Sequence, residues 1–308
     1  MRQEAYFCTV KELDELGKNN IPRQLISHTH LIYSSPATLA FNSPGAEGFG
    51  VKRAGLAVPD SVMLIVSPGC CGRNTSVLSS MRAYQDRFYY LLMDETDIVT
   101  GRHLKKIPKA VAEICEGLKK KPSVVMICIT CVDALLGTDM ERVCHKAEEY
   151  AGVPVRPCYM YALTREGRKP PMVHVRQSVY SLLEPKKKKG NVVNLLGYFS
   201  PLTDDCELYD LLHGAGVKTI HEISRCKDYA QYQTMSEANF NLVLHPEARF
   251  AAEDFHDRLK IPYIELRRLY QIDKIASQYR AFAAALGVEF EDEIPRKAAE
   301  EAVEKIPG

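Results

Sequence analysis

The feature that most constrains the fold of this chain is a regular alternation of short apolar runs with longer stretches of helical periodicity. A continuous apolar run of strand length is typical of a strand buried on both faces of a parallel sheet. The first half contains four such runs, at residues 61–67, 88–93, 123–130 and 153–159. A helical stretch follows each of the first three runs. The first begins near Thr75, the second covers about 104–118, and the third ends at Tyr150. The pattern therefore predicts an α/β domain with a doubly wound parallel sheet.

The second half repeats this pattern and predicts a second Rossmann-like domain. Its predicted strands begin with the apolar run 191–197 and continue with residues 217–223, 240–245 and 262–266. The stretches between these runs predict helices within 203–216, 227–237 and 247–259. No GxGxxG motif follows the first run, so dinucleotide binding is not indicated.

A run of four lysines marks the best boundary between the two halves. Lys186–Lys189 lie between Pro185 and Gly190, and a charged run in this setting predicts an exposed linker. We expect three regions: an N-terminal α/β domain at 1–185, a second domain at 190–285 and a helical tail at 286–308. Two further segments are predicted as loops, the glycine-rich 45–50 and the polar 94–101.

Composition limits the classes of protein to which the chain can belong. Apolar residues make up 46% of its 308 residues and charged residues 26%, as in soluble globular proteins. The net charge of +1 does not favour a nucleic-acid partner. No apolar run approaches the roughly 18 residues of a membrane span, and the acidic N-terminus lacks the apolar segment of a signal peptide. We therefore expect a cytoplasmic protein whose partners include neither a membrane nor a nucleic acid.

Ten cysteines in such a protein need a chemical explanation, because the cytoplasm disfavours disulfides. Cys70 and Cys131 each lie just beyond an apolar strand and just before a helix. Ligands bind at this edge of an open parallel sheet, and a helix N-terminus lowers the pKa of a thiol. Gly69 and Gly72 flank the Cys70–Cys71 pair and let the backbone approach a bulky group. These positions favour thiolate ligation of a metal.

Other interpretations of the cysteines are weighed against this one. Cys115, Cys128 and Cys144 lie in strand or helix patterns, where buried packing is the simplest role of a free cysteine. Cys128 and Cys131 form a CxxC pair, but a redox CxxC normally opens a helix and Cys128 lies within a strand. No second close pair of Cys or His completes a tetrahedral zinc site.

Several segments together resemble the nitrogenase component 1 superfamily over roughly residues 40–285. SPGC at 67–70 is similar to its Gly-Cys turn, MDETDIVTGRHLKKIPKAVAEI at 93–114 to its acidic stretch and following helix, and ITCVDALLGTDMERV at 129–143 to its third cluster-cysteine segment. The strands of the second half match in order. The superfamily includes nitrogenase catalytic subunits, their cofactor-assembly homologues, the dark-operative protochlorophyllide reductase and the nickel-sirohydrochlorin reductive cyclase.

The resemblance implies a fold of two doubly wound, nitrogenase component 1-like domains and assigns ligands to an iron–sulfur cluster. Cys70 and Cys131 correspond to cluster ligands, and Cys71 is an alternative to Cys70 because the turn can be aligned one residue later. Four further positions would shape the cluster loops and the docking surface: Asp97, Gly101, Gly137 and Asp139.

The chain also departs from the family pattern in three ways. Residues 41–50 lack the cluster cysteine that usually precedes the Gly-Cys turn. The position of the nitrogenase cofactor cysteine falls at Leu244, with His245 beside it at the end of a predicted strand. His245 is a candidate cofactor or substrate contact, although strand-end histidines are often ordinary loop residues. Family subunits usually carry a third α/β domain, by which this chain is expected to be shortened.

One chain offers two well-placed thiolates, whereas a 4Fe-4S cluster usually takes four. We therefore expect a cluster bridging two subunits, in a homodimer or in a heterodimer with a related subunit. The leading hypothesis is an oxidoreductase subunit that accepts electrons from an ATP-dependent iron–sulfur reductase partner, because this chain has no GxxxxGK[ST] loop of its own. A scaffold or carrier for a cluster or cofactor precursor is the alternative, and a cluster-free binding protein is the third. The substrate and the catalytic residues stay unassigned.

Overall fold

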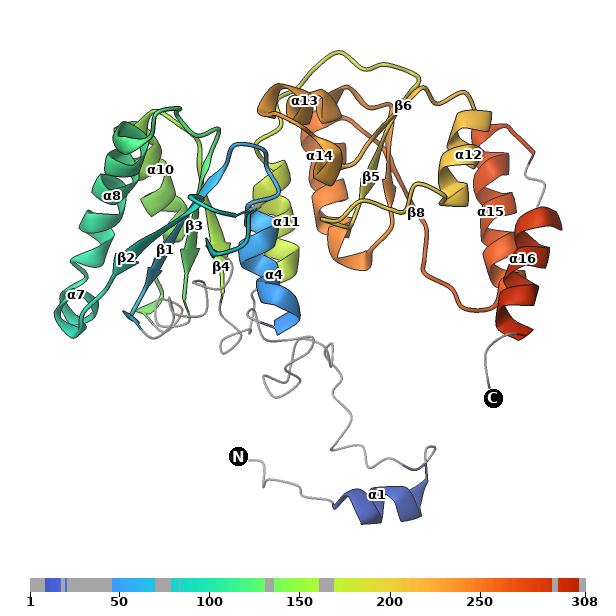
Figure 1. Ribbon diagram of the computed structural model, residues 1–308, viewed down its shortest axis with the longest axis horizontal. Helices are drawn as coiled ribbons and strands as arrows, with labels where there is room; N and C mark the ends of the chain where they lie inside the picture. The colour runs from blue at the N-terminus through green and yellow to red at the C-terminus, as the bar shows by residue number, and fades with distance from the viewer. Residues whose placement is uncertain are drawn as a thin grey trace.

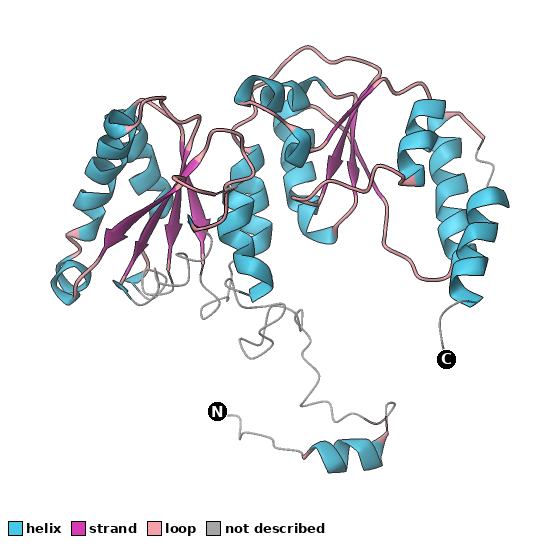
Figure 2. Cartoon of the chain, viewed as in Figure 1, coloured by secondary structure: helices cyan, strands magenta, loops and turns pink. Residues whose placement is uncertain are grey.

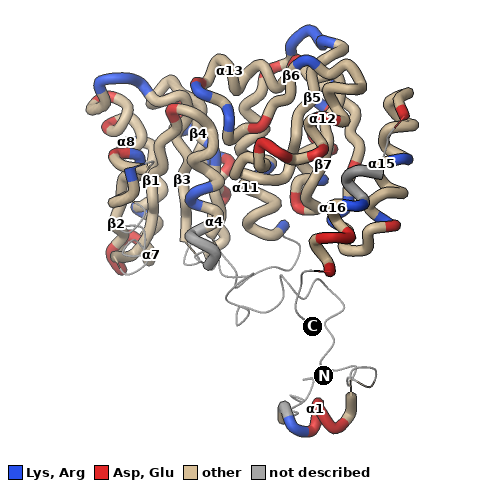
Figure 3. The backbone as a smooth tube through the Cα atoms, turned by 45° about the vertical axis from the view of Figure 1, so that its right-hand side comes forward, with Lys and Arg blue, Asp and Glu red and all other residues tan. Residues whose placement is uncertain are grey.

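The computed structural model describes residues 9–17, 20, 46–69, 79–82, 84–130, 136–160, 169–289 and 293–304. Two four-stranded parallel sheets, each with helices on both faces, make up the main body (Figures 1 and 2). Every apolar run predicted as a strand forms one, so the expected α/β class is confirmed. Basic and acidic residues are interspersed over the helices and loops around both sheets (Figure 3), in keeping with the small net charge.

The first sheet has the strand order β2-β1-β3-β4. Its strands are β1 (Val62–Ser67), β2 (Phe88–Leu92), β3 (Val125–Ile129) and β4 (Val155–Tyr159). One face packs on α8 (His103–Gly117) and α10 (Met140–Ala151), and the other on α4 (Ala46–Gly55) and α11 (Pro171–Tyr180). Successive residues of β1 and β3 alternate between these two cores, as the two-residue period of a strand requires.

The second sheet repeats this arrangement with the order β6-β5-β7-β8. Its strands are β5 (Val192–Leu196), β6 (Thr219–His221), β7 (Phe240–Val243) and β8 (Tyr263–Glu265). One face packs on α12 (Glu207–Gly214) and α15 (Ile272–Leu286), and the other on α13 (Tyr229–Gln233) and α14 (Arg249–Leu259). The short helices η2 (Ile223–Arg225), η3 (Thr234–Glu237) and η4 (Pro246–Ala248) complete the connections.

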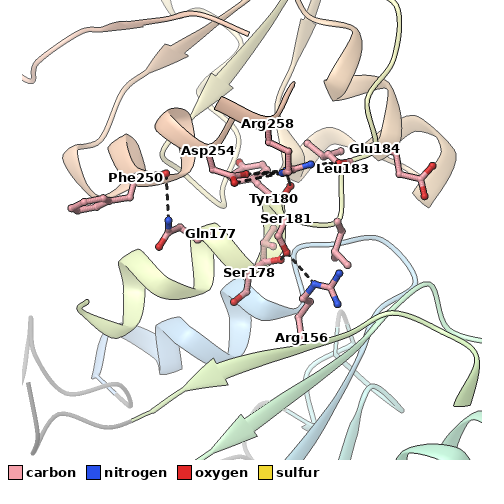
Figure 4. A network of polar contacts seen from close by, with 12 residues as sticks. Arg156, Gln177, Ser178, Tyr180, Ser181, Leu183, Glu184, Phe250, Asp254 and Arg258 are labelled. Carbon is pink, nitrogen blue, oxygen red and sulfur yellow. Dashed lines mark hydrogen bonds and ion pairs between the residues drawn. The ribbon is translucent and has the colours of Figure 1, made fainter. Parts of the chain in front are cut away.

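A single apolar core joins the two sheets through α11. This core extends from Met63 in β1, through Val175 in α11, to Phe255 in α14. Polar contacts reinforce the same joint (Figure 4): Arg258 of α14 donates to the carbonyl oxygen of Tyr180 at 3.1 Å while it pairs with Asp254. Because helix α11 packs on β4 of the first sheet and on α14 and η4 of the second half, the two sheets hold a defined position relative to each other.

Two segments predicted as loops form helices instead. Residues 46–50 begin α4, which is held against the sheet by its buried residues Val51 and Ala54, so the loop prediction is wrong there. Residues 95–100 form α7 (Glu95–Thr100), because Asp94 and Asp97 supply a complete capping box at its start. Both helices depend on contacts that a local glycine-rich or acidic composition does not reveal.

The remaining predictions concern the linker, the tail and membrane spans. Lys186 and Lys187 are exposed, whereas the Lys188 ammonium donates to the carbonyl oxygen of Ser236 in η3 at 2.6 Å. The tail contains α16 (Glu293–Glu304), and the helix expected near Thr75 lies outside the described residues. No helix in the described ranges is both long and apolar enough to cross a bilayer. The exact boundaries of the predicted domains stay a prediction.

Gly55, the last residue of α4, provides a test of the packing against the first sheet. A Cβ atom at this position would lie 2.6 Å from Cε of Met63 and 2.9 Å from Sγ of Cys158. We expect Gly55→Ala to destabilise the protein by about 1–3 kcal/mol, because the core must shift to admit the methyl group. Urea denaturation followed by circular dichroism measures the change.

Gly117 is the matched control, because it is the last residue of α8 and a Cβ atom there meets nothing within 4 Å. Gly117→Ala should leave stability unchanged or raise it by up to about 1 kcal/mol, since alanine restricts the unfolded chain. Equal urea midpoints for the two variants would show that α4 is not packed against β1 and β4 as described.

Candidate functional site

Both sheets reverse their strand order at one point, between β1 and β3 in the first sheet and between β5 and β7 in the second. Ligands of open α/β sheets bind beyond the carboxyl ends of the strands at this switch point. Val66 pairs with Ile129 at the end of one strand pair, and Leu196 pairs with Val243 at the end of the other. These two edges are therefore the candidate functional sites.

Two buried hydroxyl groups mark the carboxyl edge of the first sheet. Ser67 ends β1 and Thr130 directly follows β3, with side chains that are 0% and 2% exposed. Neither hydroxyl has a hydrogen-bond partner among the residues that the structure describes. Both lie on the face covered by α4 and α11, because each is two residues beyond a member of that core, Ile65 or Cys128. A ligand with acceptor atoms at this edge would satisfy both groups.

The predicted cluster ligands Cys70, Cys71 and Cys131 lie outside the described residues. In the sequence, Cys131 directly follows Thr130, and Cys70 follows Ser67 by three positions. The segments that carry the cysteines therefore leave two adjacent, parallel strands at the same edge. Two buried hydroxyl donors at this edge suit a ligand whose sulfur atoms accept hydrogen bonds, as those of an iron–sulfur cluster do. Within the described ranges, no group of three or more His, Cys, Asp or Glu residues could hold a metal.

Helix α4 places a buried lysine on the same side of the first sheet. Lys52 is 1% exposed, and its charge acts on the thiol of Cys128 in β3. Burial raises the pKa of Cys128 to about 12, and the Lys52 ammonium partly opposes that rise. Cys128 is only two residues from Thr130, so the positive charge lies near the edge that the two hydroxyls mark.

The cysteines interpreted as packing residues are buried in the structure. Cys115 is 8% exposed, Cys128 0% and Cys144 2%. Burial raises the pKa of all three thiols, so they are protonated at neutral pH. A protonated thiol inside β3 disfavours a redox pair between Cys128 and Cys131. The packing interpretation therefore fits these three residues.

The acidic segment after β2 owes its shape to Asp97. The Asp94 carboxylate accepts from the backbone N–H of Asp97 at 2.6 Å and so caps α7. The Asp97 carboxylate is 1% exposed and accepts from Lys106 at 2.6 Å and from Arg102 at 3.0 Å. Gly101 ends the helix at φ 66°, in the left-handed region that glycine favours. These contacts explain the shape of the loop, while its part in docking stays a prediction.

Gly137 and Asp139 define the start of α10 in a similar way. Gly137 has φ 67°, so a side chain at this position would strain the backbone. Asp139 is the N-cap of α10, and its carboxylate accepts from the backbone N–H of Arg142 at 3.0 Å. The two residues therefore set how the chain enters α10 after β3, and a role toward a cluster stays a prediction.

At the second edge, the chain leaving β5 touches the chain leaving β7. Gly197 has φ 139°, and a Cβ atom there would lie 2.8 Å from both Cβ and the backbone nitrogen of His245. The backbone N–H of Leu244 donates to the carbonyl oxygen of Leu196 at 2.8 Å. Only glycine allows this approach, so Gly197 lets His245 lie against the chain that leaves β5.

A buried arginine of α11 fills the space beside this contact. The Arg176 guanidinium donates to the carbonyl oxygen of Gly197 at 2.8 Å and to the Glu247 carboxylate at 2.8 Å. It also lies 4.9 Å from the ring centre of Phe199. A buried pair of this kind needs both partners, because either charge alone would be left without compensation. The pair connects α11 to the second sheet at its functional edge.

His245 itself is a neutral, partly exposed imidazole. Burial lowers its pKa first, the nearby charge of Arg176 lowers it further, and Glu247 only partly opposes these effects. Its side chain is 35% exposed, Nδ1 accepts from the backbone N–H of Glu247 at 3.3 Å, and Tyr198 meets the ring edge-on at 5.8 Å. A neutral imidazole at this edge could bind a metal or hydrogen-bond a ligand.

Sequence reasoning missed Lys52, Arg176 and Glu247. The segment that contains Lys52 begins in the glycine-rich stretch predicted as a loop, so its burial could not be foreseen. Arg176 offered a signal, because it interrupts the buried face of α11 formed by Val173, Val175 and Val179. A charged residue within an apolar helical face suggests a buried ion pair, but the sequence does not reveal the partner 71 residues away.

Residues 47–307 match the family described as nitrogenase component 1 type oxidoreductase, and the chain belongs to this family. The nitrogenase iron-molybdenum cofactor biosynthesis protein NifE of Nostoc sp. is 27% identical over 239 residues, which cover 75% of this chain and 49% of that protein. NifE of Klebsiella pneumoniae is 26% identical over 266 residues, 79% of this chain and 58% of that protein. The chain thus spans about half the length of the curated relatives that it matches.

Solved structures show the same fold. The structure of nitrogenase Cp1 at pH 6.5 has a TM-score of 0.59 over 82% of this chain and 59% of its own, at 17% sequence identity. The structure of nitrogenase Cp1 at pH 5 has a TM-score of 0.53. The match covers 83% of this chain and 54% of that chain, at 22% sequence identity. The predicted superfamily and fold are therefore confirmed.

The ion pairs of Asp97 predict a pH-dependent stability. Hydrogen bonds from Lys106, then from the Asp94 backbone and Arg102, lower the pKa of Asp97 below its ordinary value of 3.8. This contribution is complete above about pH 4 and is lost as the pH falls through the lowered folded-state pKa. Asp97→Asn should therefore lower the urea midpoint at pH 7, and the difference from the parent protein should shrink towards pH 3.

Asp86 provides the control for this experiment. Its side chain is exposed, and its φ of 59° is one that asparagine tolerates. Asp86→Asn should leave the urea midpoint nearly unchanged at both pH values. A difference between Asp97→Asn and the parent protein that stays constant from pH 7 to pH 3 would contradict a stabilising role for the carboxylate.

Proposed function

We propose that this chain is the iron–sulfur-cluster-binding subunit of a cytoplasmic, nitrogenase-like oxidoreductase. Cys70 and Cys131 bind a 4Fe-4S cluster, with Cys71 as the alternative to Cys70, and a second subunit completes the ligand set. An ATP-dependent iron–sulfur reductase gives up one electron for each electron that the cluster gains. The electrons then reduce a substrate that is not yet identified.

The observation that carries this proposal is the pairing of β1 with β3 at the switch point of the first sheet. Residues 70 and 131 are far apart in the sequence, but the strands before them are adjacent and end at one edge. Family membership supports the same chemistry. The residues that match the family, 47–307, include both Cys70 and Cys131, which the resemblance implies as ligands.

The residues around this edge have distinct roles in the proposal. The cluster would supply one-electron redox chemistry when it is bound. Ser67 and Thr130 would donate hydrogen bonds to sulfur atoms, and the Lys52 ammonium would offset part of the negative charge. Hydrogen bonds and nearby positive charge both stabilise the reduced state. His245 lies at the other switch point, where it could contact the substrate or a cofactor.

Exposed apolar residues near the same edge support a contact with a second subunit. Leu92 ends β2 and is 59% exposed, Val99 on α7 is 85% exposed, and Leu136 before α10 is 45% exposed. Apolar groups gathered at one edge are typical of an interaction surface. A homodimer or a heterodimer with a related subunit joined here would bring two pairs of thiolates together.

The scaffold or carrier function is the second candidate, and a specific observation favours it. The curated relatives are cofactor biosynthesis proteins by name rather than catalytic subunits. In this role the same edge would hold a cluster or cofactor precursor and release it to another protein. His245 would then contact cargo rather than substrate.

Substitution of the ligands tests the cluster site. Cys70→Ala and Cys131→Ala should each remove most of the bound iron and sulfide from anaerobically purified protein. Each should also abolish the paramagnetic resonance signal of the dithionite-reduced protein. Cys128→Ala is the matched control, because this buried cysteine lies three residues before Cys131 and should not bind the cluster. Retention of the full signal in Cys70→Ala and in Cys71→Ala would reject the assignment at this turn.

The iron content of the purified assembly tests the bridging arrangement separately. Four thiolates from two chains predict about four iron atoms per dimer. A value of about four per chain would reject the bridge while leaving a cluster site in place. Cluster binding and its sharing between subunits can thus be judged independently.

A transfer experiment distinguishes the two candidate functions. We expect the loaded protein, reduced by a limiting amount of dithionite-reduced iron–sulfur reductase with ATP, to be reoxidised at least tenfold faster when a substrate is added to take up the electrons, while its iron stays bound. Absorbance at 400 nm and iron analysis after gel filtration measure the two outcomes. Loss of iron to an apo-acceptor without faster reoxidation would instead identify a scaffold.

A further inference from the structure

A cleft of about 670 Å³ lies between the two halves of the chain, away from the cluster edge. The first half contributes the end of α4, the loop before β1, and Tyr84. The second half contributes the segments that follow β5 and β6, which are carboxyl ends of the second sheet. The volume falls within the roughly 300–1,000 Å³ of small-molecule sites. The position of the cleft and its size both suit a ligand rather than a surface irregularity.

Both walls of the cleft are held in place by arginine side chains. On the first wall, Arg87 donates to the carbonyl oxygen of Leu56 at 2.8 Å. On the second, Arg225 donates to the carbonyl oxygen of Leu202 at 2.9 Å and to the Glu222 carboxylate at 2.8 Å. Glu222 in turn accepts from the backbone N–H of Leu202 at 2.9 Å. The cleft is therefore pre-formed, which limits the entropy that a ligand would lose on binding.

The charges that line the cleft favour an anion. Arg53 comes from α4 and Lys227 from the segment after β6, so each wall contributes a cation. Arg53 donates to the hydroxyl of Tyr84 at 3.2 Å, and no described carboxylate pairs with the ammonium of Lys227. Asp60 is the acidic residue of the described lining, and Lys120 already binds its carboxylate at 2.8 Å. Clefts lined by one sign of charge concentrate ligands of the opposite sign.

The remaining lining defines the body of the ligand. Phe199 and Met172, both half-buried, present apolar surface to the cleft. A nucleotide would need a glycine-rich phosphate loop, which this edge lacks. An apolar body with acidic groups at its periphery matches the lining best.

We propose that this cleft binds an organic polycarboxylate between Arg53 of one wall and Lys227 of the other. Arg53 meets a carboxylate with its planar guanidinium, and Lys227 meets a second one as a point charge. The described lining from the first half includes Pro59 and Asp60 before β1 rather than residues beyond it, so the proposal does not depend on cluster binding.

Cys226 lines the cleft and provides a built-in reporter of its charge. Iodoacetate and iodoacetamide alkylate the same thiolate, but only iodoacetate is an anion. Burial raises the pKa of the Cys226 thiol to about 11, which slows both reagents equally and cancels in the ratio of their rates. The iodoacetate-to-iodoacetamide ratio, measured at pH 9 by site-resolved mass spectrometry after chymotryptic digestion, therefore reports the attraction of anions.

We expect this ratio to be several-fold higher at Cys226 than at Cys206. Cys206 is also half-buried, but it lies outside the cleft, and acidic residues adjoin it on both sides. Lys227→Gln and Arg53→Gln should each lower the ratio at Cys226 by about two- to threefold, as expected for loss of one nearby charge in a partly solvated cleft. Lys186→Gln removes an exposed charge from the linker and should change nothing.

Protection by added anions tests the class of ligand. At equal ionic strength, propane-1,2,3-tricarboxylate should slow the labelling of Cys226 by iodoacetamide more than inorganic phosphate does, and Lys227→Gln should weaken the protection. Equal ratios at Cys226 and Cys206, or a ratio unaffected by both substitutions, would overturn the anion site. Equal protection by phosphate would overturn the carboxylate assignment.

Discussion

The structure depends on the packing of one helix, α11, between β4 of the first sheet and the helices α14 and η4 of the second half. Its apolar residues join a core that runs from β1 to α14, and its buried Arg176 binds the carbonyl oxygen of Gly197 and the Glu247 carboxylate. The apolar contacts supply most of the free energy, while the arginine specifies the orientation, since a buried cation tolerates few arrangements. Every site between or beside the two halves follows from this joint.

The two sheets use the same topology for two different edges. Each has its switch point between its two central strands, and each places the unusual residues of its half there. In the first sheet these are buried hydroxyls followed by cysteines, whereas in the second they are a glycine, a histidine and an ion pair. The first edge suits an electron-rich cluster, and the second suits a neutral imidazole contact. A protein that moves electrons from a cluster to a ligand needs both kinds of site on one rigid framework.

Polar groups left unsatisfied or buried at these edges have an energetic cost that points to function. Ser67 and Thr130 bury hydroxyls without partners in the described residues. Such groups destabilise a protein unless a partner compensates them, so their concentration at one sheet edge is informative. The cleft is built differently, because its cations face solvent at little cost and its walls are held by hydrogen bonds to backbone carbonyl oxygens. The two sites therefore differ in the ligand that each can stabilise.

The sequence by itself determined the eight strands, the parallel sheets and the position of Cys70 and Cys131 just beyond two of those strands. Apolar continuity and strand length are local properties, so they can be read from neighbouring residues. The sequence did not reveal α4 and its buried Lys52, the partner of Arg176, or the cleft between Arg53 and Lys227. Each of these depends on residues far apart in the chain, and only the packing of α11 between the two halves brings them together. Tertiary structure alone decides such contacts, because the burial of a side chain and its distance from an interacting residue are properties of the folded molecule.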